Sequence, residues 1–114
     1  MSAHGTGTVY NDLMELTAFS EVFGRRLPIH SVKGALGHTL GAAGGIETAL
    51  ALQSLAAGWL PPTCGCSEPE AAAEGQVSSR AVPLPGETLL TTNSGFGGIN
   101  AALLLEKGEG RHAG

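Results

Sequence analysis

Hydrophobic residues recur at a helical period in the first quarter of the chain. Apolar positions within residues 13–23 are spaced three or four residues apart, which is the spacing of one face of a helix. We expect this helix to be capped by Asn11 or Asp12 and to end at Gly24. Glu15 follows Asp12 by three residues, which resembles a capping-box arrangement. The pattern therefore predicts an amphipathic helix after an N-terminal loop.

A second apolar repeat predicts another helix in the middle of the chain. It runs through residues 46–57 and is followed by Gly58 and the pair Pro61-Pro62, which end a helix. A short extended stretch at residues 27–32 precedes it. We expect this stretch to form a buried strand.

The last third of the chain has the pattern of a strand, a turn and a strand. Apolar runs at residues 87–92 and 101–106 flank a glycine-rich segment at residues 95–98. Residues 64–86 are rich in Pro, Gly and Glu and are expected to form a long surface connection, with one edge strand near residues 77–82. The expected order, strand-helix-strand-helix-strand-strand, is that of an α/β fold.

Composition indicates one domain that is part of a larger structure and argues against several classes of partner. The chain has 114 residues, which is enough for one domain, and we assign residues 1–107 to it and residues 108–114 to a flexible tail. Only 14% of the residues are charged, against about 25% in a typical domain, which favours part of a larger packed structure. The net charge of −4 argues against binding to nucleic acid or to an anionic membrane. No apolar run is long enough for a membrane span and no signal peptide opens the chain, so we expect a cytoplasmic protein.

The two cysteines are interpreted as ordinary loop residues. Cys64 and Cys66 are separated by one residue, so they cannot readily form a disulfide with each other. A zinc site would need two further ligands at a suitable spacing. Neither cysteine precedes a helix start that would lower the pKa of a thiol nucleophile. We therefore expect no metal site and no catalytic cysteine in this chain.

The density of small residues is highest in residues 31–47, around Lys33 and His38. Five of these residues are glycine, which tolerates backbone dihedrals and close approaches that other residues cannot. We expect Lys33 and His38 on a tight loop at, or just inside, the start of the central helix. A helix start favours negative charge nearby, which suits a site where an oxyanion develops.

Three motifs, in the same order along the chain, resemble those of the β-ketoacyl synthases, the condensing enzymes of fatty-acid and polyketide assembly. The run from Lys33 through His38 to Gly44 resembles their second histidine motif. Residues 3–8, followed by Asn11-Asp12 and Glu15, resemble their first histidine motif. Residues 92–100 resemble their glycine-rich active-site loop. The resemblance covers residues 3–105, nearly the whole chain.

The resemblance implies the C-terminal half of a thiolase-like fold. It also implies decarboxylative Claisen condensation of an acyl thioester with malonyl-acyl carrier protein, in fatty-acid or polyketide synthesis. The nucleophilic cysteine of this family lies in an N-terminal half that nothing here resembles. The implied partners are acyl carrier protein, the missing half and, in the complete enzyme, a second copy in a homodimer. No cofactor is implied beyond the phosphopantetheine of the carrier protein. A catalytically inactive remnant, or an interaction protein that binds a synthase or carrier protein, is the alternative.

The resemblance also assigns roles to the charged and imidazole side chains. His4 and His38 would each donate an N–H to the malonyl thioester carbonyl and stabilise the enolate oxygen. A second histidine, rather than asparagine, is typical of the elongating class in this family. Lys33 would orient or polarise the histidines together with Glu47. The residues alone leave open that Lys33 is a solvated lysine at a helix start.

The remaining implied site residues would contact the substrate. Thr6 and Thr8 would line the tunnel for the phosphopantetheine arm, although they could equally be loop hydroxyls that satisfy backbone groups. Phe96, between Gly95 and Gly97, would gate the acyl pocket and provide a backbone N–H to a second oxyanion hole, or else be a core aromatic. The family loop commonly has one more phenylalanine, directly after the residue that corresponds to Ser94.

Overall fold

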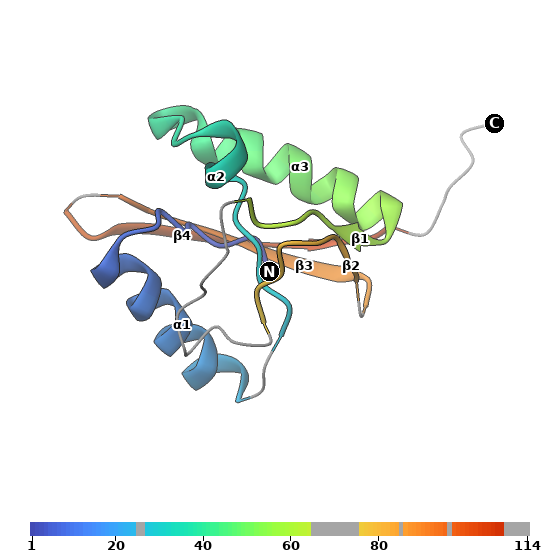
Figure 1. Ribbon diagram of the computed structural model, residues 1–114, viewed down its shortest axis with the longest axis horizontal. Coiled ribbons are helices and arrows are strands. Elements are labelled where there is room, and N and C mark those ends of the chain that lie inside the picture. The colour runs from blue at the N-terminus through green and yellow to red at the C-terminus, as the bar shows by residue number, and fades with distance from the viewer. Residues whose placement is uncertain (25–26, 65–75, 85, 96, 109–114) are drawn as a thin grey trace.

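The computed structural model describes residues 1–24, 27–64, 76–84, 86–95 and 97–108. These residues form helices on two sides of a small sheet (Figure 1). The helices are α1 (Val9–Phe23), α2 (Lys33–Leu36), the 3₁₀ helix η1 (Leu40–Ala42) and α3 (Ala43–Ala57), and the strands are β1 (Trp59–Leu60), β2 (Val82–Pro83), β3 (Thr88–Gly95) and β4 (Ile99–Glu106).

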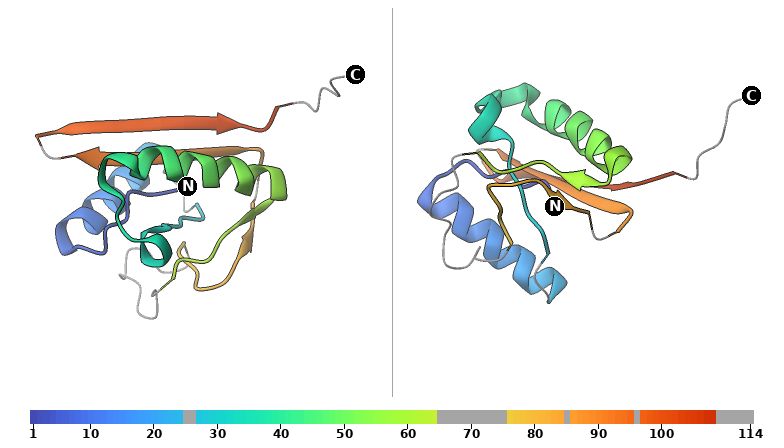
Figure 2. Two further views of the ribbon diagram at one scale, coloured as in Figure 1. Left: turned by 90° about the horizontal axis from the view of Figure 1, so that it is seen from above. Right: turned by 45° about the vertical axis from the view of Figure 1, so that its right-hand side comes forward.

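The sheet is built on the hairpin of β3 and β4, which pair antiparallel along their whole length from Thr88↔Glu106 to Gly95↔Ile99. The predicted strand, turn and strand are confirmed. Beside β3, Ser2 forms parallel bridges to both Thr91 and His30, so the N-terminal segment lies between β3 and the chain near residue 30. The long β4 forms the outer edge, as the view from above shows (Figure 2).

Alternating side chains of β3 contribute to two separate hydrophobic cores, which is the two-residue period of a strand. Leu89 faces α3 in a cluster with Ala51, Leu55 and Leu60. Leu90 faces the other side, where α1 packs Phe19 and Leu16 against Met1, Ala3 and Ile29. The helices α1 and α3 therefore cover opposite faces of the sheet, as Figure 1 shows. The structure confirms the predicted α/β class.

The start of α1 differs from its prediction. The helix begins at Val9 with Thr8 as its N-cap residue, earlier than an Asn11 or Asp12 cap would give. Asp12 instead accepts a hydrogen bond at Oδ1 from the backbone N–H of Gly7, at 3.3 Å. The predicted capping box was wrong, because the backbone N–H of Asp12 donates to the Thr8 carbonyl and the Glu15 carboxylate binds other groups. The predicted end at Gly24 is confirmed, with φ of 60° in the left-handed region.

The shorter extended segments also differ from their predictions. The buried strand expected at residues 27–32 is limited to isolated bridges at Ile29 and His30. The edge strand expected near residues 77–82 is the two-residue β2, which pairs with the unpredicted β1. Residues 65–75 of the predicted connection and 109–114 of the predicted tail lie outside the described residues. In the described part of the chain, no helix combines the length and the apolar character needed to cross a membrane.

Candidate functional site

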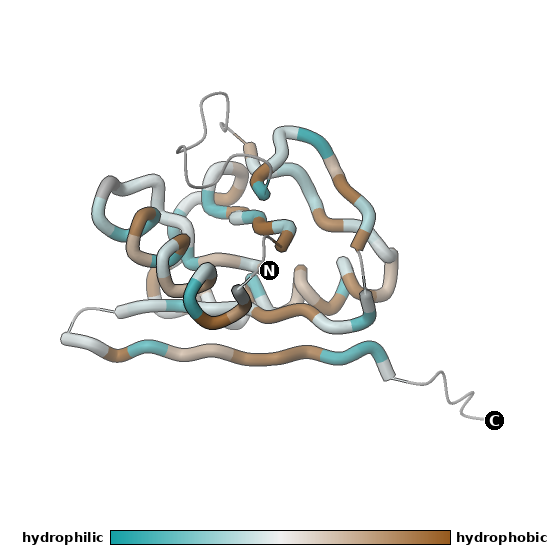
Figure 3. Tube along the Cα trace, turned by 90° about the horizontal axis from the view of Figure 1, so that it is seen from below, coloured by the Kyte–Doolittle hydropathy of each residue, from teal (hydrophilic) through white to brown (hydrophobic). Residues whose placement is uncertain are grey.

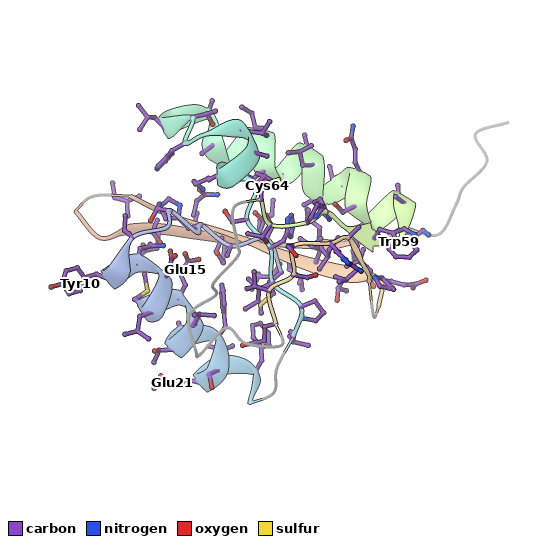
Figure 4. The ribbon with its side chains drawn as sticks, in the orientation of Figure 1. Tyr10, Glu15, Glu21, Trp59 and Cys64 are labelled. Carbon is purple, nitrogen blue, oxygen red and sulfur yellow. The ribbon has the colours of Figure 1, made fainter. Side chains whose placement is uncertain are left out.

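His4 lies directly after the N-terminal segment that pairs with β3, and only 6% of it is exposed. The Glu15 carboxylate fixes the backbone there: Oε2 accepts from the His4 N–H at 2.9 Å and Oε1 from the Gly5 N–H at 2.7 Å. Asn11 Nδ2 and Thr92 Oγ1 donate to the same carboxylate at 2.7 and 3.3 Å. Figure 4 shows Glu15 pointing from α1 toward the strands. The buried charge thus has four donors around it.

His38 lies on the connection between α2 and η1, and its side chain is exposed. The backbone N–H of Leu40 donates to His38 Nδ1 at 3.1 Å. Leu40 has φ of 54°, which is uncommon for a residue with a side chain and costs free energy. The expected loop at His38 is present, but it lies before η1, and α3 begins five residues after His38, at Ala43. A separate short helix, α2, carries Lys33.

The fold brings the two imidazoles together. His4 and His38 are 34 positions apart in the sequence, and their ring centroids are 5.5 Å apart with an angle of 85° between the ring planes. His4 is buried and His38 is exposed, so solvent reaches this pair of rings from the side of His38.

A buried ion pair lies behind His4. Lys33 Nζ is 2.6 Å from Glu47 Oε1, and their side chains are 6% and 3% exposed. Asn93 Nδ2 donates to the other carboxylate oxygen, Glu47 Oε2, at 2.8 Å. Asn93 Oδ1 is 3.1 Å from His4 Nδ1. The expected pairing of Lys33 with Glu47 is present, and Asn93 connects it to His4.

These contacts give the two neutral imidazoles opposite tautomers. Because Glu47 can only accept, the amide nitrogen of Asn93 must face it, and Asn93 Oδ1 then accepts from His4 Nδ1–H. Neutral His4 therefore has its lone pair on Nε2. His38 Nδ1 accepts from Leu40, so neutral His38 carries its hydrogen on Nε2. This departs from the expectation that both neutral rings donate, because His4 can donate from Nε2 only when it is protonated.

The residues expected to contact substrate are only partly described. Thr6 and Thr8 lie beside His4 on the loop before α1, and their hydroxyl groups hydrogen bond to each other at 2.8 Å. Gly95 ends β3, and Gly97 follows in the hairpin turn with φ of 82°. Phe96, the expected gate, lies outside the described residues.

Reasoning from the sequence missed two residues that hold His4. Glu15 was interpreted as part of a capping box and as following the first histidine motif, and Asn93 as part of a glycine-rich motif, without a contact to His4. A signal for both was present, since each is a polar residue inside a run whose other members are apolar or small. A buried polar side chain requires hydrogen-bond partners, so both residues were candidates for contacts within the site.

Comparison with known proteins identifies relatives of the chain. Residues 1–67 match the family model described as "Beta-ketoacyl synthase, C-terminal domain". The chain is 36% identical over 111 residues to the tetracenomycin polyketide synthase ketoacyl synthase alpha subunit of Streptomyces glaucescens, covering 94% of this chain and 26% of that protein. It is also 36% identical over 109 residues to 3-oxoacyl-[acyl-carrier-protein] synthase 1 of Escherichia coli K12, covering 94% of this chain and 27% of that protein.

Solved structures give the same result for the fold. A β-ketoacyl synthase from Burkholderia phymatum matches with a TM-score of 0.86 and 32% identity, over 95% of this chain and 28% of that chain. A type II polyketide ketosynthase, in complex with its acyl-carrier protein and bound to a hexaketide, matches with a TM-score of 0.88 and 29% identity, over 95% and 28% of the two chains. These neighbours show that the fold is thiolase-like. The chain spans about a quarter of the length of the curated relatives it matches.

Proposed function

This chain belongs to the β-ketoacyl synthase family, and from that premise we propose that it supplies the malonyl side of a condensing active site. The observation that carries the proposal is the pair of imidazoles, 5.5 Å apart, each with one nitrogen held by a defined partner. The acyl side, with its cysteine nucleophile, would come from the part of the relatives that this chain does not cover.

The proposed reaction needs stabilisation of a developing negative charge. Loss of carbon dioxide from a malonyl thioester leaves its electron pair on the remaining two-carbon unit, as a thioester enolate. The enolate carbon then attacks the acyl thioester carbonyl, a carbon–carbon bond forms and the cysteine thiolate leaves. Fixed hydrogen-bond donors directed at the enolate oxygen are the most effective way to lower this barrier.

His38 is the donor in this proposal. Its Nδ1 is held by the Leu40 N–H, so a neutral ring has Nε2–H available, and the ring is exposed to an incoming substrate. His4 is the acceptor of the pair while it is neutral, because its hydrogen is directed at Asn93. Lys33 and Glu47 act behind His4, where their buried charges neutralise each other.

We further propose a carrier-protein substrate. The phosphopantetheine arm of an acyl carrier protein would pass Thr6 and Thr8, whose hydroxyl groups lie on the loop that follows His4. Phe96, with Gly95 and Gly97 on either side, would gate the acyl pocket. One structural relative was solved with its acyl-carrier protein, which supports this class of partner. A homodimer of the complete enzyme, and the absence of any other cofactor, stay predictions.

Exposed apolar side chains support the proposal that another part of the enzyme packs against this chain. Large apolar side chains are exposed on α2, η1 and α3, where Leu36 is 54%, Leu40 76% and Leu52 50% exposed. Exposure of this kind on neighbouring elements is typical of a surface that another part of a protein covers.

Reconstitution tests the proposal. The chain should be joined to, or expressed with, a cysteine-bearing N-terminal part of a β-ketoacyl synthase, and incubated with acyl and malonyl thioesters of acyl carrier protein. We expect carbon dioxide release and a β-ketoacyl product from the complete enzyme, and neither from the 114-residue chain alone. Normal acylation of the cysteine without carbon dioxide release would indicate an inactive remnant. Condensation by the chain alone, lost in Cys64→Ser, would contradict the proposal.

A further inference from the structure

His4 is held from two opposite faces of the sheet by consecutive residues of β3. Thr92 faces α1 and donates to Glu15, which fixes the His4 backbone. Asn93 faces α3, where it contacts both Glu47 and the His4 ring. The strand period places these two side chains on opposite faces. Asn93 therefore holds the ring of His4, whereas Glu15 holds its backbone.

We propose that Asn93 is a positioning residue, which fixes the neutral tautomer of His4 by connecting its ring to the buried ion pair. The effect of Asn93 on catalysis rests on the proposed function, whereas its effect on the tautomer of His4 does not. An asparagine amide has a donor end and an acceptor end, and Glu47 determines which end faces which neighbour. The Glu47 carboxylate is paired with Lys33, so the donor end of Asn93 faces it.

The direction of this chain of contacts matters for the chemistry. Lys33 donates to Glu47, Asn93 donates to Glu47, and His4 donates to Asn93. The last hydrogen is therefore on Nδ1 of His4, and Nε2 carries the lone pair. A side chain without this polarity would leave the tautomer of His4 undetermined. Outer partners that set a histidine tautomer affect activity from about 10-fold to about 10⁴-fold in other enzymes.

The surroundings of Asn93 guide the choice of substitutions. An added Cβ at Gly44 of α3 would be 3.7 Å from Asn93 Nδ2, an ordinary contact distance, so the side chain of Asn93 lies next to Gly44. Asn93→Leu keeps a side chain of similar size and removes both polar ends. Asn93→Asp keeps the acceptor for His4 but replaces the donor with a charge that repels Glu47. The matched control is Gln53, an exposed amide side chain on α3 outside the candidate site.

The test is the tautomer of His4, measured by solid-state ¹⁵N NMR on histidine-labelled complete enzyme that includes this chain. The His4 signals are assigned by their loss in His4→Gln. We expect Nδ1–H in the neutral wild-type ring, a shift toward Nε2–H in Asn93→Leu, and the wild-type tautomer in Gln53→Leu. In Asn93→Asp, we expect the wild-type tautomer in the neutral ring, because the carboxylate still accepts from His4 Nδ1–H.

Two outcomes would overturn the inference. One is an Nε2–H tautomer for neutral His4 in the wild-type enzyme, a measurement that does not depend on any variant folding. The other is an unchanged tautomer in Asn93→Leu. The rate of malonyl decarboxylation, measured on the same samples, separates this inference from the proposed function. Expected tautomers in an enzyme that does not decarboxylate would refute the function and leave the positioning role of Asn93 intact.

Discussion

At the scale of single residues, the environment of His4 depends on buried polar side chains with complete sets of partners. Glu15 has backbone and side-chain donors around both carboxylate oxygens, and Glu47 has Lys33 on one oxygen and Asn93 on the other. A buried charge is tolerated only when it is paired or surrounded by donors. The cost of burial is therefore offset by contacts that also determine where His4 and its hydrogen lie.

Glu15→Gln tests the first of these carboxylates. The amide has one accepting oxygen, so a donor among the His4 and Gly5 N–H groups would face an amide NH₂ instead. We expect a loss of about 1–3 kcal/mol in the free energy of unfolding, which urea denaturation would measure. Glu21→Gln on the exposed face of the same helix is the control (Figure 4). Equal stability of the two variants would contradict the role given to Glu15.

His30 gives a stability prediction that depends on pH. It is 2% exposed, both ring nitrogens lack a hydrogen-bond partner among the described residues, and burial lowers its pKa from 6.5 to about 4. As the pH falls below 6.5, the unfolded chain binds a proton that the folded chain does not. Stability should therefore decline between about pH 6.5 and pH 4, by about 3 kcal/mol in total.

The measurement is the urea midpoint across this pH range in wild type and in His30→Leu, which cannot titrate. The variant should lose the part of the decline that comes from this ring, and it also removes two unpaired nitrogens from the core. An identical pH dependence in the two proteins would show that His30 is not the titrating group.

At the scale of elements, the glycine of α2 determines how closely this helix approaches the loop after β1. An added Cβ at Gly34 would lie 2.3 Å from the backbone carbonyl oxygen of Cys64, a distance at which one of the two segments must move. Lys33 precedes Gly34 in the same helix, so a shift of α2 would strain its ion pair with Glu47.

Gly34→Ala should therefore lower the free energy of unfolding by about 1–3 kcal/mol, the usual cost of overpacking. Thermal unfolding would measure this. Gly41→Ala is the control, since an added Cβ there meets no atom within 4 Å and its φ is not positive. An unchanged or higher free energy of unfolding in Gly34→Ala would contradict this, because it would mean that the loop at Cys64 moves without cost.

Much of the element plan could be predicted from the sequence, because strong local signals determine it. The β3–β4 hairpin, the end of α1 at Gly24 and the end of α3 at Gly58 follow from apolar periods and glycine positions. The start of α1 could not be predicted, because Asp12 can bond forward as a cap or back to Gly7, and only the loop geometry decides. The pairing of Ser2 with His30 and Thr91 could not be predicted either, because an isolated bridge produces no repeating pattern in the sequence.

The candidate site was predictable in its residues but not in its contacts. His4, His38, Lys33 and Glu47 are identified by motifs, and the fold does bring them close together. The tautomers could not be predicted, because they depend on Asn93 and on the Leu40 N–H, which reach the rings only in the folded chain. Local motifs therefore identify candidate residues, while long-range contacts determine which nitrogen of each neutral ring carries the hydrogen.

At the scale of the whole molecule, the chain combines a layered core with surfaces that lack a cover. The hydropathy view shows apolar stretches along β4 at the rim (Figure 3), and Leu104 there is 67% exposed. On the outer face of α1, Tyr10 is 89% exposed and points away from the molecule (Figure 4). These surfaces agree with a chain that spans about a quarter of the length of its relatives.

The central claim is that His38 serves the decarboxylation of malonate in a complete enzyme. The most direct measurement is the release of labelled carbon dioxide from malonyl-acyl carrier protein by His38→Ala, alongside acylation of the cysteine. Gln53→Ala, an exposed change on α3, is the control. We predict a loss of about 10²–10³ in carbon dioxide release with acylation preserved, because one oxyanion donor is removed. Unchanged carbon dioxide release with a collapse of acyl transfer would contradict the account.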